Sequence, residues 1–185
     1  MTADRARQSR GALVLLATLV LSLNLCASEL PGALREHLPS LKLYGSADMR
    51  QFGFKIYTAR LWTDEQGYRA AAPYALDLEY ALNIDADDLV ETSIKEMRRQ
   101  GQNDEALLAR WQQAMAQVFP DVRKGDRLIG VAVPGVEARF YSARGYIASI
   151  RDADFVKAFF GIWLDDDTRA PRVRARLLGD GLPHL

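Results

Sequence analysis

Alternating apolar and polar positions predict β-strands in the first part of the chain beyond its N-terminal segment. From Leu41 to Trp62 the residues are mostly apolar or aromatic, and Gly45 and Gly53 indicate two strands or one bent strand. From Tyr74 large apolar residues occupy every second position as far as residue 82, the period of a strand with one face in water. These segments therefore predict paired strands joined by a turn.

Helical periodicity follows in the middle of the chain. One predicted helix begins after Asp85, a favourable N-cap residue, and ends before Gly101, a favourable residue just beyond a helix. The next is capped by Asn103 and ends at Pro120. In both segments the apolar residues recur three and four positions apart, so each helix presents one face to a core.

The last third of the chain returns to strands and then to helices. We expect a strand over Asp126–Val133, a hairpin over Glu137–Ile150, a helix capped by Asp152, and a final helix from Pro171 to Gly179. Neither a repeat nor a linker interrupts this order. It predicts one α+β domain over residues 29–185, a curved antiparallel sheet with a layer of helices on one face.

The N-terminal segment predicts export. Three arginines precede the uncharged, mostly apolar stretch Gly11–Leu25, and small residues follow it. This is the pattern of a secretory signal peptide over residues 1–28, cleaved near Ser28. The mature protein would then lie in the periplasm without spanning the membrane. The alternatives are an uncleaved anchor and lipidation of Cys26.

Composition and charge exclude several classes of function. The chain has 24 Lys and Arg against 24 Asp and Glu, whereas a nucleic-acid binder normally has a basic excess. One Cys and two distant His, His37 and His184, predict neither a disulfide framework nor a zinc site. The acidic run Asp165–Asp167 lacks the spacing of a calcium loop, and we interpret it as solvated. We therefore expect no nucleic-acid partner, cofactor or metal.

The segment FGFKIYTARLW mixes polar and apolar residues on both faces of its predicted strand. Regular alternation puts Phe54, Ile56, Thr58, Arg60 and Trp62 on one face and Lys55, Tyr57, Ala59 and Leu61 on the other. A mixed face suits a cleft that binds an amphipathic ligand, in which a few polar groups orient an apolar body. Alternatively, Tyr57 and Arg60 are ordinary sheet residues with satisfied hydrogen bonds.

Five stretches, in the same order and spacing, resemble the bacterial exported branch of the chalcone isomerase-like family. They are Gly45–Trp62, Ala75–Arg99, Arg110–Leu128, Phe155–Leu164 and Pro171–Gly179. The resemblance implies an open-faced β-sandwich, a large antiparallel sheet covered by helices. That fold agrees with the order of elements predicted from the residue pattern.

The resemblance does not bring the isomerase's catalytic side chains with it. The positions that match the family's Arg, Thr, Tyr, Asn and late Thr are Ala47, Tyr57, Asp88 or Leu89, Lys95 or Glu96, and Val173. None of these residues keeps the family's catalytic side chain. We therefore assign no catalytic residue and expect no cyclisation of chalcones.

The family's fatty-acid-binding relatives hold a carboxylate with an Arg and a Tyr. Tyr57 matches their Tyr, and Arg50 lies three residues after the position of their Arg. The resemblance thus implies a binding protein for a small amphipathic or fatty-acid-like molecule, with Tyr57 and Arg50 as ligand contacts. Bringing both into one cleft requires a break in regular pairing around Phe52–Phe54. The alternatives are an intramolecular lyase or isomerase with a substituted site, and a structural interaction module.

Overall fold

A computed structural model describes residues 30, 32–38 and 40–179, and in this part of the chain six strands form one antiparallel sheet. Each strand pairs with its neighbours in sequence, in the order β1-β2-β3-β4-β5-β6. The strands are β1 Lys42–Gln51, β2 Phe54–Thr63, β3 Tyr74–Tyr80, β4 Arg127–Val133, β5 Glu137–Ser142 and β6 Gly145–Ile150. The predicted strands and the hairpin near the end of the chain are all present.

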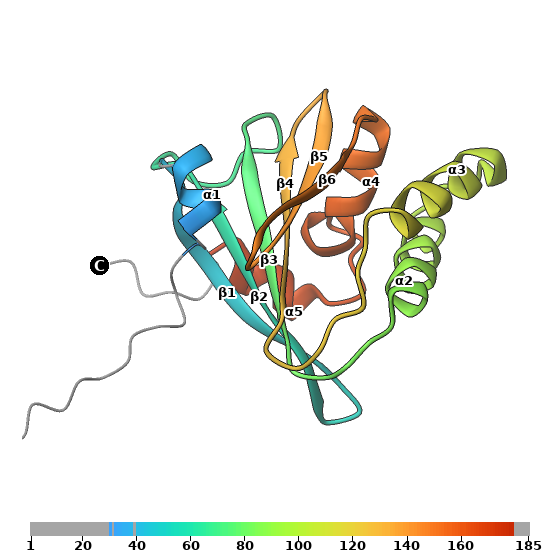
Figure 1. Ribbon diagram of the computed structural model, residues 1–185, viewed down its shortest axis with the longest axis horizontal. Helices are drawn as coiled ribbons and strands as arrows, with labels where there is room; N and C mark the ends of the chain where they lie inside the picture. Colours follow the sequence, from blue (N-terminus) through green and yellow to red (C-terminus); the bar gives the residue numbers. More distant parts are fainter. Residues whose placement is uncertain (1–29, 31, 39, 180–185) are drawn as a thin grey trace, which may run out of the picture.

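Helices cover one face of this sheet, as the sequence predicted (Figure 1). They are α2 Ala86–Arg99, α3 Glu105–Ala116, α4 Ala153–Leu164 and α5 Pro171–Leu177. Met97, Trp111, Phe159 and Leu177 of these helices pack with Leu76 and other inward residues of the strands in one hydrophobic core. The α+β, open-faced sandwich is therefore confirmed.

A short helix that the sequence analysis did not predict lies against the other face of the sheet. This is α1, Gly32–His37, and Leu30 and Leu34 pack there with Trp62, Ile129 and Tyr141. Those strand residues alternate with the ones that face α2 to α5. Six residues are too few to show a helical period, so the pattern along the chain does not reveal α1.

The segment from Leu41 to Trp62 forms two strands joined by a tight turn. Phe52 and Gly53 both have positive φ, 50° and 84°, between the paired residues Gln51 and Phe54. The pairing also shifts register, because Met49 lies opposite Tyr57 whereas Arg50 lies opposite Lys55. One extra residue, at position 56, therefore bulges from β2.

This bulge corrects part of the predicted assignment of faces. Lys55 Nζ is 2.9 Å from Asp48 Oδ1, which also accepts a hydrogen bond from Thr58. Ile56 instead lines the same cleft as Tyr57. Strict alternation had put Lys55 with Tyr57 and Ile56 with Thr58, and it fails here because the extra residue shifts the phase by one.

Two of the three predicted N-cap residues, Asp85 and Asp152, stand at the N-cap positions, but the Asp85 side chain makes no capping hydrogen bond. Asp152 accepts hydrogen bonds from the backbone N–H groups of Asp154 and Phe155, as expected of the α4 cap. The cap of α3 is Asp104, whose carboxylate accepts from Leu107 N at 3.0 Å, and not the predicted Asn103. The two adjacent residues are both good caps, so composition alone cannot choose between them.

The predicted signal peptide, residues 1–28, lies outside the described residues, as does His184. Within the described part of the chain, no helix is both long and apolar enough to cross a bilayer.

Candidate functional site

A cleft of about 590 Å³ lies between the first strands of the sheet and helices α2 and α4. Its size is within the range of pockets for small organic ligands. The buried part of its wall is largely apolar and aromatic: Leu78, Tyr80, Phe119, Leu128, Phe159 and Trp163. Exposed charged residues also line it: Arg50, Asp88, Lys95 and Arg169. The cleft therefore combines an apolar interior with a polar opening.

Tyr57 lines this cleft from strand β2. Its hydroxyl oxygen accepts a hydrogen bond of 2.9 Å from Trp163 Nε1 on α4. Burial raises the pKa of Tyr57 to about 12, although the bond from Trp163 acts in the opposite direction. The hydroxyl is thus neutral at physiological pH. Among the described residues no acceptor takes its proton, which remains available to a ligand.

Arg50 lines the same cleft but is exposed and engaged elsewhere. Its Nη2 lies 3.6 Å from Asp48 Oδ2, and its Nη1 lies 3.5 Å from the carbonyl oxygen of Gly53. The structure thus brings Tyr57 and Arg50 to one cleft, with the guanidinium directed toward Asp48. A break in regular pairing is present, at position 56, while Phe52 and Gly53 form the hairpin turn.

A third cation, Lys95, lines the cleft from helix α2. Arg169 is paired with Glu96, at 3.0 Å between Nε and Oε1, and Arg50 with Asp48. The side chain of Lys95 makes no hydrogen bond or ion pair with any other residue that the structure describes. Its positive charge is therefore free to meet an anionic group. Sequence reasoning missed this residue as a ligand contact because a lysine on a polar helix face resembles any solvated lysine.

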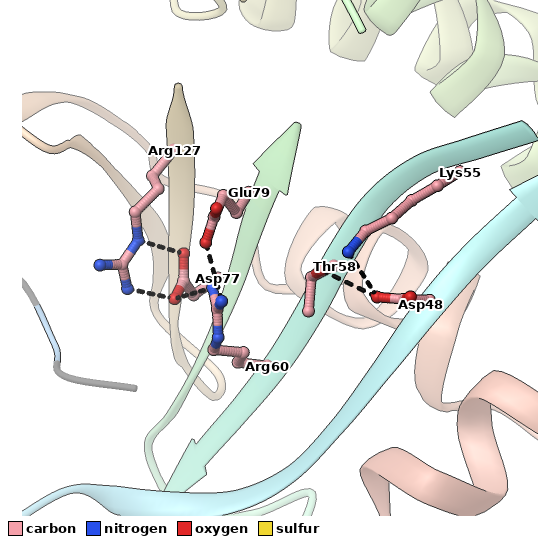
Figure 2. A network of polar contacts seen from close by, with 7 residues as sticks. All are labelled: Asp48, Lys55, Thr58, Arg60, Asp77, Glu79 and Arg127. Carbon is pink, nitrogen blue, oxygen red and sulfur yellow. Dashed lines mark hydrogen bonds and ion pairs between the residues drawn. The ribbon is translucent and has the colours of Figure 1, made fainter. Parts of the chain in front are cut away.

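Polar residues on the opposite face of the sheet form a separate network. Figure 2 shows Asp77 bound by Arg127, with 3.0 Å between Arg127 Nε and Asp77 Oδ1. Arg60 reaches across to Glu79, with 2.7 Å between Nη2 and Oε2, and its Nη1 lies 3.7 Å from Asp77 Oδ2. Asp77 is fully buried. The network joins β2, β3 and β4, so Arg60 is a sheet residue and not a cleft residue.

The positions that match the isomerase's catalytic residues divide between core and cleft. Ala47 and Val173 are buried in the hydrophobic core. Asp88, Lys95 and the neighbouring candidates at positions 89 and 96 line the cleft with Tyr57. Within the described residues, no group of three or more His, Cys, Asp or Glu side chains could hold a metal ion.

Comparisons with known proteins identify the family of the chain. The family model described as chalcone isomerase-like matches residues 25–179. An uncharacterized protein from Haemophilus influenzae is 29% identical over 136 residues, which are 73% of this chain and 66% of that relative. The chain thus spans just under two thirds of the relative's length.

A similar fold is found in the crystal structure of a fatty-acid binding protein from Arabidopsis thaliana. The TM-score is 0.58 at 10% sequence identity, and the match covers 75% of this chain and 87% of that one. At this identity the likeness establishes the fold alone.

Proposed function

The chain belongs to the chalcone isomerase-like family, and from this premise we propose that it binds a small amphipathic molecule, of the fatty-acid type, in its sheet–helix cleft. The observation that carries the proposal is the cleft itself, with an apolar interior and a cation, Lys95, that has no partner among the described residues. An acyl chain would bury apolar surface in the interior, and a carboxylate would meet the cation.

The polar contacts would come from three side chains. The Tyr57 hydroxyl can donate a hydrogen bond into the cleft while it accepts one from Trp163. Lys95 supplies a positive charge without first breaking an ion pair. Arg50 would have to leave Asp48, but an exposed pair of this kind costs little to break. We therefore propose Tyr57 and Arg50 as ligand contacts, with Lys95 beside them.

The test is displacement of a fluorescent fatty acid from the purified protein. Losing one charged hydrogen bond costs roughly 1.5–3 kcal/mol, so Lys95→Ala and Arg50→Ala should each weaken binding roughly ten- to a hundredfold. Arg172→Ala is the matched control, an exposed helix cation that does not line the cleft. If Lys95→Ala and Arg50→Ala both bind the fatty acid as tightly as Arg172→Ala and the wild type do, the proposed head-group site is contradicted. Native mass spectrometry of protein taken from its own periplasm would identify a ligand that co-purifies.

We predict no chalcone isomerase activity above background, against the alternative of an isomerase or lyase with a substituted site. Ala47 and Val173 are buried apolar residues at two of the matched positions, and Tyr57, with its pKa near 12, is a poor base at neutral pH. Loss of acid–base groups alone removes about 10²–10⁴ in rate. The check is an absorbance assay, and saturable, stereoselective cyclisation would contradict the prediction.

We also propose that residues 1–28 are a signal peptide and that the mature protein, residues 29–185, lies in the periplasm. The support is the arginine-flanked apolar stretch Gly11–Leu25. N-terminal sequencing of the exported protein should find a start near Ser28. An intact Met1 in that fraction would be the contrary result.

A further inference from the structure

Two of the largest exposed apolar side chains lie at the tip of the β1–β2 hairpin. Phe52 is 90% exposed and Phe54 is 71% exposed. Figure 1 shows this hairpin projecting beyond the ends of the other strands. Leu82, 40% exposed, follows β3 beside it, where Ala81 N donates a hydrogen bond to Ile56 O at 2.8 Å. Phe52, Phe54 and Leu82 are thus an exposed apolar cluster at one end of the molecule.

The backbone at Phe52 indicates that this residue is not there for stability. Its φ is +50°, which is unfavourable for a bulky side chain, and a tight turn with two positive φ values favours Asn-Gly. A phenylalanine that is both strained and almost fully exposed buries no surface to offset the strain. Strain of this kind is more common where a residue has a function.

The shape of the cluster favours a bilayer over a protein as its partner. A stable protein interface buries about 800 Å² on each side, more than the tip of a two-residue turn can offer. A bilayer's interfacial region accepts a few aromatic side chains on a projecting turn. Arg50 and Lys55 flank the phenylalanines. Both pair with Asp48, Arg50 at 3.6 Å and Lys55 at 2.9 Å, and partly exposed pairs of this kind cost little to exchange for lipid phosphates.

The cleft lies next to the same tip. Arg50, Gln51 and Leu82 all line it, so the hairpin and the segment after β3 form part of its wall. We propose that Phe52 and Phe54 insert into the head-group region of a phospholipid bilayer and hold the opening of the cleft at the membrane surface. A water-insoluble ligand could then enter the cleft without crossing bulk water. Binding of the bilayer itself does not depend on what the cleft holds.

The first test is co-sedimentation with vesicles of phosphatidylcholine, with and without phosphatidylglycerol. The protein is taken from the exported fraction, so it carries the N-terminus that the cell gives it. The Phe52→Asn and Phe54→Ser variants should each lower the vesicle-bound fraction, with roughly tenfold weaker partitioning. Val136→Ser is the matched control. Val136 is 56% exposed in the β4–β5 turn, which lies at the opposite end of the strands from the β1–β2 turn.

Phe52→Asn also separates loss of binding from loss of folding. Because Asn-Gly suits the turn, this variant should melt at a higher temperature than the wild type while it binds vesicles more weakly. A wild type that binds neither kind of vesicle would overturn the proposal. So would a double variant, Phe52→Asn with Phe54→Ser, that binds as the wild type does, or a dimer in sedimentation velocity that these substitutions abolish.

A second readout is local to the hairpin. The three native tryptophans are all buried, at 1% to 8% exposure. Brominated lipids in the vesicles should therefore quench added fluorescence in Phe54→Trp and leave the native signal almost unchanged. Equal quenching in the wild type and in Phe54→Trp would contradict insertion of the tip.

Discussion

At the scale of single residues, Tyr57 belongs both to the wall of the cleft and to a hydrogen bond that joins two elements. Its ring lines the cleft, and its hydroxyl accepts a hydrogen bond from Trp163, 106 positions further along the chain. The same side chain therefore joins β2 to α4 and presents a proton to the cleft. A change at Tyr57 will affect folding as well as binding, so the two effects must be measured separately.

Tyr57→Phe should lower the free energy of unfolding by about 1–3 kcal/mol, because it leaves the indole N–H of the buried Trp163 without an acceptor. Urea denaturation measures the change. Tyr146→Phe is the control, since Tyr146 is 58% exposed. Equal stability of Tyr57→Phe and the wild type would mean that the bond contributes nothing to folding.

At the scale of elements, Asp152 connects two helices. It caps α4, and its Oδ2 accepts a hydrogen bond of 2.9 Å from Trp111 Nε1 on α3. Burial alone would raise the pKa of Asp152, but the hydrogen bonds from Trp111 and from the backbone outweigh it and hold the pKa below its ordinary value. The carboxylate is therefore ionised at neutral pH, and its contribution to stability is lost as pH falls through this lowered pKa.

Asp152→Ala should destabilise the protein by about 2–4 kcal/mol, since it removes a cap and leaves a buried indole unpaired. Asp104→Ala removes only a cap, whose carboxylate accepts from Leu107 N, and should cost about 1 kcal/mol. Chemical denaturation of both variants compares the two. Equal losses would show that the bond to Trp111 is not needed.

A second element-scale feature is the close approach of β1 to the end of α5. A Cβ atom at Gly45 would lie 2.2 Å from the carbonyl oxygen of Leu177 and 2.5 Å from that of Arg176. Backbone atoms cannot give way as a flexible side chain would, so α5 would have to move off the strand.

Gly45→Ala should therefore lower stability by about 1–3 kcal/mol. Gly32→Ala is the control, because nothing lies within 4 Å of a Cβ built there. The midpoints of urea denaturation measure both. If Gly45→Ala unfolds at the wild-type midpoint, α5 is free to shift.

At the scale of the whole molecule, burial opposes the ionisation of five tyrosines: Tyr57, Tyr68, Tyr74, Tyr80 and Tyr141. The pKa rises furthest above the ordinary value of 10.0 at Tyr57, Tyr74 and Tyr80. In the unfolded chain these groups lose their protons near that value. Above it the folded state holds more protons than the unfolded state, so the free energy of unfolding falls as pH rises.

Stability should accordingly be nearly level up to about pH 10 and fall above it by about 1.4 kcal/mol per pH unit for each buried tyrosine. Urea denaturation between about pH 9 and pH 11 measures the slope. Tyr80→Phe should make this slope smaller by about 1.4 kcal/mol per pH unit, the contribution of one tyrosine. A slope that is the same in the variant would assign the alkaline loss to other groups.

The amino-acid sequence by itself determined the order of most elements and the fold. Periodicity and caps predicted the strands and α2 to α5, and the five resembling stretches indicated the open-faced sandwich. These signals are local, because a two-residue or 3.6-residue period reports directly which face of an element is buried.

Only the tertiary structure decided which side chains meet. The bulge at position 56 reverses the faces of Lys55 and Ile56, and it depends on pairing with β1. Trp163 reaches Tyr57 from a distant helix. Arg50 pairs with Asp48 and Arg169 with Glu96, whereas the Lys95 side chain pairs with no residue that the structure describes. Hydrogen bonds and ion pairs depend on neighbours in space that are remote along the chain. A local pattern therefore predicted where the elements lie, and the packed fold alone determined which charge faces the cleft.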